Sequence, residues 1–122
     1  MGFSALEGLV MGTRCGSLDA GVVLHLLRQP DLGLADVERI LFERSGLLGV
    51  SGLSPDMRDL LAAEADRPDV AEAIELFCHR VVREAGGLIA LMGGVDRLVF
   101  SGGIGEHAAS LRQRIVDRLA WL

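Results

Sequence analysis

Aromatic side chains are scarce in this chain of 122 residues, which has no tyrosine, one tryptophan and four phenylalanines, whereas glycine occurs 16 times. Glycine at this frequency is typical of tight turns and of places where the backbone approaches a ligand closely. Half of the residues are hydrophobic and 24% are charged, which is the composition of a single globular domain. A chain of this length can bury only a modest core.

Cysteine and positive charge are also in short supply. The two cysteines, Cys15 and Cys78, form no CxxC pair, which predicts free thiols in a reducing compartment and hence a cytoplasmic protein. The net charge of −5 disfavours binding to the phosphates of nucleic acid. The three histidines fall on separate predicted elements without paired spacing, so a zinc site is not expected.

Long hydrophobic runs are missing. No stretch reaches the roughly 18 apolar residues of a membrane-spanning helix, and the amino terminus lacks a basic region followed by an apolar run. We therefore expect neither export nor a membrane partner.

The first half of the chain contains two helix signals followed by a loop. Asp19 can cap a helix that runs to about Gln29, where Pro30 stops it. A second helix is predicted over Ala35–Arg44 from its apolar face. Glycines, serines and a proline in Ser45–Asp59 then predict a loop that leads into a short helix.

The second half contains the strongest periodic pattern. Apolar residues recur at steps of three and four from Pro68 to Met92, which predicts one long helix that ends at Gly93. The apolar run in Val95–Phe100 predicts a short strand buried on both faces, and a final helix is expected from Glu106. No second strand is evident, so an α/β fold would need partner strands from elsewhere.

Leu98–Leu111, with the sequence LVFSGGIGEHAASL, is the most informative local motif because the predicted strand runs through three glycines into a helix. Such a turn lets a ligand approach the backbone, and the helix start favours phosphate or other polar groups. The motif is neither GxGxxG nor a Walker A sequence. A tight turn that needs glycine only for steric reasons explains it equally well.

Two further segments place charged residues beside glycine or a helix start. Arg14 lies between Gly12 and Gly16, where its guanidinium could contact a carboxylate or phosphate, or could simply be solvated. Asp56 and Arg58 open the short helix after the glycine-rich loop. There, Asp56 could be an N-cap and Arg58 a surface charge, or both could line a ligand site.

Three segments together resemble the acetate kinase family in order and approximate spacing, and the resemblance covers essentially the whole chain. They are LEGLVMGTRCGSLDAGV, SGLLGVSGLSPDMRD and GGVDRLVFSGGIGEHAASLRQRI. The resemblance implies a superfamily that contains sugar kinases, actin and heat-shock ATPases. Residues 1–122 would then be part of a nucleotide-binding, ribonuclease-H-like (actin-like ATPase) lobe, mostly helical with the short buried strand.

The resemblance also implies roles for individual residues. Arg14, in MGTR, would be catalytic and would stabilise the phosphoryl group in transfer. The residues implied to line the adenosine site are Asp56, Met57, Arg58, Gly103, Ile104, Gly105, Glu106 and His107. The sequence departs from the family pattern at Cys15, Ser17, Ala20 and His107, where the family has serine, aspartate, proline and asparagine.

The family's phosphate loop, catalytic aspartate, transition-state histidine and magnesium-linked glutamate have no counterpart in this sequence. We therefore expect a fragment of an acetate kinase that uses ATP or ADP and Mg²⁺, with the magnesium ligands outside this chain. In its full-length context it would convert ATP and acetate to ADP and acetyl phosphate, and alone it would be inactive. Alternatives are a stand-alone nucleotide-binding or protein-interaction module, or a propionate or butyrate kinase relative. A homo-oligomer is expected from exposed apolar surface.

Overall fold

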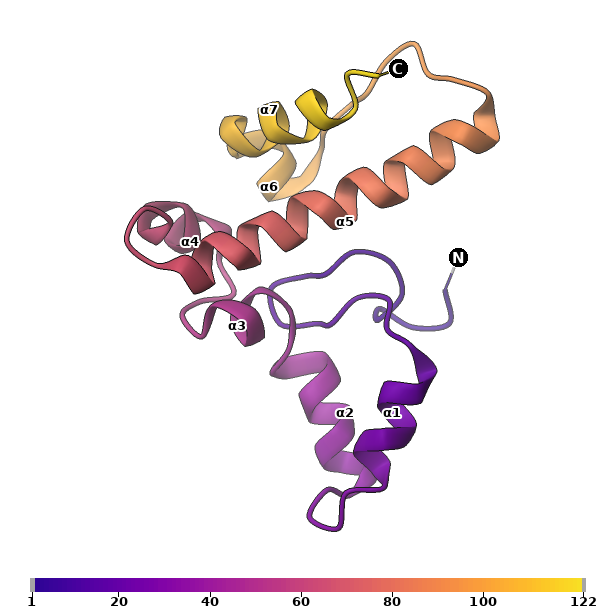
Figure 1. Cartoon of the computed structure of the whole chain (residues 1–122), viewed down its shortest axis with the longest axis vertical. Coiled ribbons are helices and arrows are strands. Elements are labelled where there is room, and N and C mark those ends of the chain that lie inside the picture. The colour runs from indigo at the N-terminus through magenta and orange to yellow at the C-terminus, as the bar shows by residue number, and fades with distance from the viewer. Residues whose placement is uncertain (1, 122) are drawn as a thin grey trace.

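The computed structural model describes residues 2–121, and these form a helical molecule built along one long helix (Figure 1). In chain order, its helices are α1 (Ala20–Leu27), α2 (Leu34–Glu43), α3 (Gly46–Ser51), α4 (Met57–Ala63), α5 (Pro68–Met92), α6 (Gly102–His107) and α7 (Ala109–Arg118). None of these helices is long and apolar enough to cross a membrane. The mostly helical character predicted from the sequence is confirmed.

The long helix α5 has the bounds predicted from its pattern. Pro68 occupies its first turn, where a missing N–H costs nothing, and Gly93 ends it in the left-handed conformation at φ 76°. Its apolar face buries Val70, Ile74 and Cys78 completely. Because α3, α4 and α7 all pack against α5, this helix organises the molecule.

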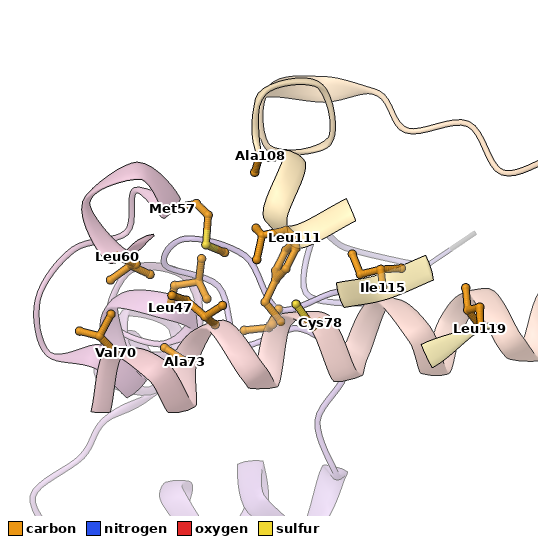
Figure 2. Packing of buried hydrophobic residues seen from close by; sticks show 13 residues of the cluster. Leu47, Met57, Leu60, Val70, Ala73, Cys78, Ala108, Leu111, Ile115 and Leu119 are labelled. Carbon is orange, nitrogen blue, oxygen red and sulfur yellow. The ribbon is translucent and has the colours of Figure 1, made fainter. Parts of the chain in front are cut away.

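The hydrophobic core lies where α5 meets these neighbours (Figure 2). Leu47 of α3 and Leu60 of α4 are fully buried at the amino-terminal end of α5. On the α7 side, Leu111, Ile115 and Leu119 repeat at helical spacing and are buried along the same core. The carboxy-terminal helix is thereby fixed over α5.

Helices α1 and α2 form a hairpin that projects from the rest of the molecule (Figure 1). The Asp19 side chain accepts a hydrogen bond of 2.6 Å from the Gly21 N–H, which confirms the predicted cap. Helix α2 matches the predicted Ala35–Arg44 within one residue at each end, and it buries Val37 and Leu41. No residue of α1 is buried.

The loop predicted over Ser45–Asp59 is wrong in part, because Gly46–Ser51 form helix α3. Gly46 begins this helix at φ 64°, and Gly52 ends it in the left-handed conformation at φ 59°. The Leu47 N–H donates to the Met11 carbonyl at 2.9 Å, so a loop distant in sequence caps the helix. The short helix predicted after this segment is confirmed as α4.

The predicted buried strand at Val95–Phe100 is wrong for the structure as described. Residues 2–121 contain no strand, and Val99 is 82% exposed. A strand needs a neighbour to satisfy its backbone groups, and this part of the chain offers none. The α/β class is therefore not formed by these residues, and the ribonuclease-H-like lobe stays a prediction.

The predicted final helix from Glu106 is also corrected, because two helices occupy that region. Helix α6 begins earlier, at Gly102, and the chain turns at Ala108 before α7 starts. Gly102 takes the left-handed backbone at φ 75°, whereas Gly103 and Gly105 are helical. The glycine-rich turn is thus shorter than the motif suggested.

Candidate nucleotide site

A pocket of about 480 Å³ lies between the start of α4 and helix α6. It is lined by Asp56, Met57, Arg58, Leu61, Gly103, Ile104, His107 and Ala108. Two sequence motifs more than 40 residues apart along the chain therefore meet at one concave surface. Six of the nine residues singled out in the sequence lie in its lining.

Asp56 and Arg58 form the charged edge of the pocket. The Asp56 side chain accepts a hydrogen bond of 2.9 Å from the Arg58 N–H and is the N-cap of α4. This was one of the two roles that the sequence allowed for Asp56. The Arg58 guanidinium also donates to both Asp56 oxygens, at 3.2 and 2.5 Å to Oδ2 and 3.1 Å to Oδ1. These hydrogen bonds lower the pKa of Asp56 to about 2, and the carboxylate is ionised at neutral pH.

Arg58 remains accessible despite this ion pair, since its side chain is 86% exposed. Its pKa is raised, first by the hydrogen bond to Asp56 and then by the charge of that carboxylate. The Arg58 guanidinium lines the pocket while it is paired with Asp56, the N-cap of its own helix. It can contact a ligand through its remaining N–H donors or through its planar face.

Helix α6 forms the opposite wall. Gly103 and Ile104 lie in its first turn and His107 at its end. A Cβ atom added at Gly103 would meet no atom within 4 Å, so this glycine leaves open space at the wall. His107 is exposed and available as a polar contact.

The other two predicted residues of this helix lie away from the pocket. Gly105 packs next to Phe100 and lines an adjoining apolar hollow of about 490 Å³, which shares Gly103 and Ile104 with the pocket. The Glu106 carboxylate accepts a hydrogen bond of 3.1 Å from the Gly102 N–H, which makes it a brace for α6. Their contact with adenosine stays a prediction.

Two lining residues escaped the sequence analysis. Leu61 follows Arg58 by three positions and Ala108 directly follows His107, so helical spacing and adjacency were the available signals. With Met57 and Ile104 they give the pocket an apolar body beneath a few polar groups. Sites for small organic ligands usually have this composition.

Arg14 lies on a separate, tightly held loop and does not line the pocket. Thr13 Oγ1 donates 2.8 Å to the Phe42 carbonyl, and the Ser45 N–H donates 2.9 Å to the Thr13 carbonyl. The Arg14 side chain itself is exposed and forms no ion pair with any residue of the described range 2–121. A rigid backbone thus presents a free guanidinium.

The loop that carries Arg14 touches the segment leading into the pocket. A Cβ atom added at Gly12 would lie 2.8 Å from the Pro55 carbonyl oxygen, directly before Asp56. Glycine therefore permits a close backbone approach at this point. The arginine loop and the segment directly before α4 therefore lie in close contact.

Metal ligands do not gather anywhere in residues 2–121. This range contains no group of three or more histidine, cysteine, aspartate or glutamate side chains that could hold a metal ion. The location of the Mg²⁺ ligands in segments outside this chain stays a prediction.

Comparison with known proteins identifies relatives over the entire chain. The model of the acetokinase family matches residues 1–122. An acetate kinase of Rhodopseudomonas palustris is 57% identical over 122 residues, which are all of this chain and 30% of that protein. An acetate kinase of Rickettsia felis is 48% identical, again over the whole chain and 31% of the relative.

Solved structures give the same result. The acetate kinase of Porphyromonas gingivalis matches with a TM-score of 0.93 and 35% identity, over 99% of this chain and 31% of that one. A propionate kinase from Francisella tularensis matches with a TM-score of 0.90 and 37% identity, over 98% of this chain and 31% of that one. The chain spans about 30% of the length of these relatives. It belongs to the acetokinase family.

Proposed function

We propose that this chain supplies the adenine-nucleotide pocket and one catalytic arginine of an acetate kinase. In the longer protein, a phosphoryl group would pass from ATP to acetate, giving ADP and acetyl phosphate. The observation that carries the proposal is the meeting of the Asp56–Arg58 and Gly103–Ala108 segments at one pocket. Family membership over residues 1–122 supports the choice of nucleotide as ligand.

The lining suits an adenosine group in its chemistry. Met57, Leu61 and Ile104 offer apolar surface for the faces of a purine ring. Asp56 and Arg58 offer a carboxylate and a guanidinium for hydroxyl and ring nitrogen atoms. His107, which stands where the family has asparagine, would contribute a ring nitrogen in place of an amide.

Arg14 would act on the transferred group, because a preorganised guanidinium stabilises charge that develops on the phosphoryl oxygens. When bound, Mg²⁺ would neutralise part of the charge on the phosphate groups. The remaining groups of the reaction are expected from segments outside this chain.

There are two alternative functions, one of a different class and one within the same family. A stand-alone module would bind nucleotide, or a protein partner, without chemistry. A relative acting on propionate or butyrate would keep the same chemistry with a different acid. The propionate kinase neighbour, at 37% identity, is as similar as the acetate kinase structures, at 35% and 38%. These similarities therefore do not distinguish between the acids.

Calorimetric titration with ADP tests the proposed pocket. In Gly103→Val the new side chain would fill open space at the pocket wall, and we expect the affinity for ADP to fall at least about tenfold. Gly87→Val is the matched control, because Gly87 also has no atom within 4 Å of an added Cβ but lies on α5, outside the pocket lining. Equal affinities in the two variants would contradict the proposal.

A further inference from the structure

Helix α6 is poorly suited to stand as a rigid wall by itself. It has six residues, Gly102 to His107, and three of them are glycines. Isolated helices of this length are unstable in water, and each glycine lowers helix stability by a further ~1 kcal/mol relative to alanine. Contacts from outside the helix must therefore define its position.

Arg112 of α7 provides such a contact. Its Nη1 donates hydrogen bonds of 3.0 Å to the Gly105 carbonyl and 2.8 Å to the Glu106 carbonyl. These carbonyls lie in the last turn of α6, where carbonyl oxygens lack intrahelical partners. A cation at this end of a helix also interacts favourably with the helix dipole.

The other two arginines of α7 behave differently. Arg114 pairs with Glu64 and Arg118 pairs with Glu75, so both are joined to carboxylates. Arg112 forms no ion pair with a carboxylate among residues 2–121, and its hydrogen bonds go to backbone carbonyls of α6. Its guanidinium is thus committed to α6.

We propose that Arg112 is a positioning residue for the nucleotide pocket. It is not part of the pocket lining, but it holds the helix from which Gly103, Ile104 and His107 line the pocket opposite α4. This role rests on the proposed nucleotide function. Nucleotide binding would then depend on a side chain that does not contact the nucleotide.

Hydrogen–deuterium exchange without nucleotide tests directly whether Arg112 holds α6 in position. In Arg112→Gln, we expect backbone amides of residues 102–108 to exchange about tenfold faster, since hydrogen bonds from a charged donor are lost. Arg118→Gln, a matched change on the same helix, should leave exchange in this segment at the wild-type rate. Arg112→Lys, which keeps the charge, should give an intermediate rate. Equal exchange in the two glutamine variants would overturn the proposal.

Titration of the same variants with ADP tests the link to binding. We expect the Kd of Arg112→Gln to rise about tenfold, that of Arg112→Lys to rise less, and that of Arg118→Gln to be unchanged. An unchanged Kd in Arg112→Gln, with faster exchange in α6, would overturn the positioning role. If the wild-type chain bound no ADP while amide exchange in residues 102–108 still depended on Arg112, the proposed nucleotide function would be refuted. The hold of Arg112 on α6 would nevertheless be confirmed.

Discussion

Replacing Gly46 with alanine should disturb the loop that carries Arg14 more than any comparable glycine substitution in α3. Gly46 has φ 64°, and an added Cβ atom would lie 2.2 Å from the Met11 carbonyl oxygen and 2.8 Å from the Arg14 carbonyl oxygen. Both contacts are with backbone atoms, so a side-chain movement cannot relieve them. The loop itself has to shift.

The magnitude follows from two separate costs. A residue with a Cβ in the left-handed conformation loses roughly 1–2 kcal/mol, and forcing packed backbone apart costs a further ~1–3 kcal/mol. Gly46→Ala should therefore lower the free energy of unfolding by about 2–5 kcal/mol. Gly52→Ala is the control, because Gly52 has φ 59° but no atom within 4 Å of an added Cβ. It should lose only the first, conformational cost.

Urea denaturation followed by far-ultraviolet circular dichroism measures both variants. The slope m is the dependence of the free energy of unfolding on urea concentration. If m is equal in the two variants, the difference between their midpoints multiplied by m gives the difference in the free energy of unfolding. We expect Gly46→Ala to be less stable than Gly52→Ala by ~1–3 kcal/mol. Equal midpoints would refute the close approach between the Arg14 loop and α3.

Three further predictions concern the loop, an ion pair and catalysis. Thr13→Val should lower the free energy of unfolding by about 1 kcal/mol in urea denaturation, because the hydrogen bond to the Phe42 carbonyl is lost; no change would argue against this tie. The Arg114 guanidinium holds the pKa of Glu64 below its usual range, so the pair stabilises the fold above the ordinary carboxyl pKa and loses this effect as pH falls through the lowered value. The free energies of unfolding from thermal melts of wild type and Arg114→Gln should differ by up to about 1 kcal/mol at neutral pH and should converge in acid. A difference that does not depend on pH would contradict the pairing. The isolated chain should form no acetyl phosphate detectable as its hydroxamate with ATP, Mg²⁺ and acetate, and turnover abolished by Arg14→Ala would disprove this.

The elements that the sequence predicted well are those defined by local signals. Helix α5 has a proline at its start, a continuous apolar period and a glycine at its end. Helix α1 has a side-chain cap at Asp19. Each of these features acts within a few residues, so it can be recognised in the sequence without knowledge of the fold.

The elements that the sequence misassigned depend on distant partners. Helix α3 begins with Gly46, a poor helix former, and its first N–H groups are satisfied by the Met11 and Gly12 carbonyls. The apolar run at Leu98–Phe100 has the composition of a strand, but residues 2–121 supply no strand beside it. In both cases the decisive hydrogen bonds, formed or missing, join segments far apart in the chain.

The candidate site was predictable only in part for the same reason. Resemblance to a family indicated Asp56–Arg58 and Gly103–His107, but nothing in their spacing shows that they share a pocket. The three-dimensional arrangement brings them together, adds Leu61 and Ala108, and places Gly105 in a different hollow.

The central claim is that adenine nucleotide binds where α4 and α6 face each other. Heteronuclear NMR spectra of the ¹⁵N-labelled chain, recorded during titration with ADP to ~10 mM, test it most directly, since this concentration exceeds a Kd of ~1 mM. We predict that amide shifts cluster in Asp56–Leu61 and Gly103–Ala108 and are absent from α1 and α2. Shifts confined to other segments, or no shifts at the highest concentration, would contradict the account.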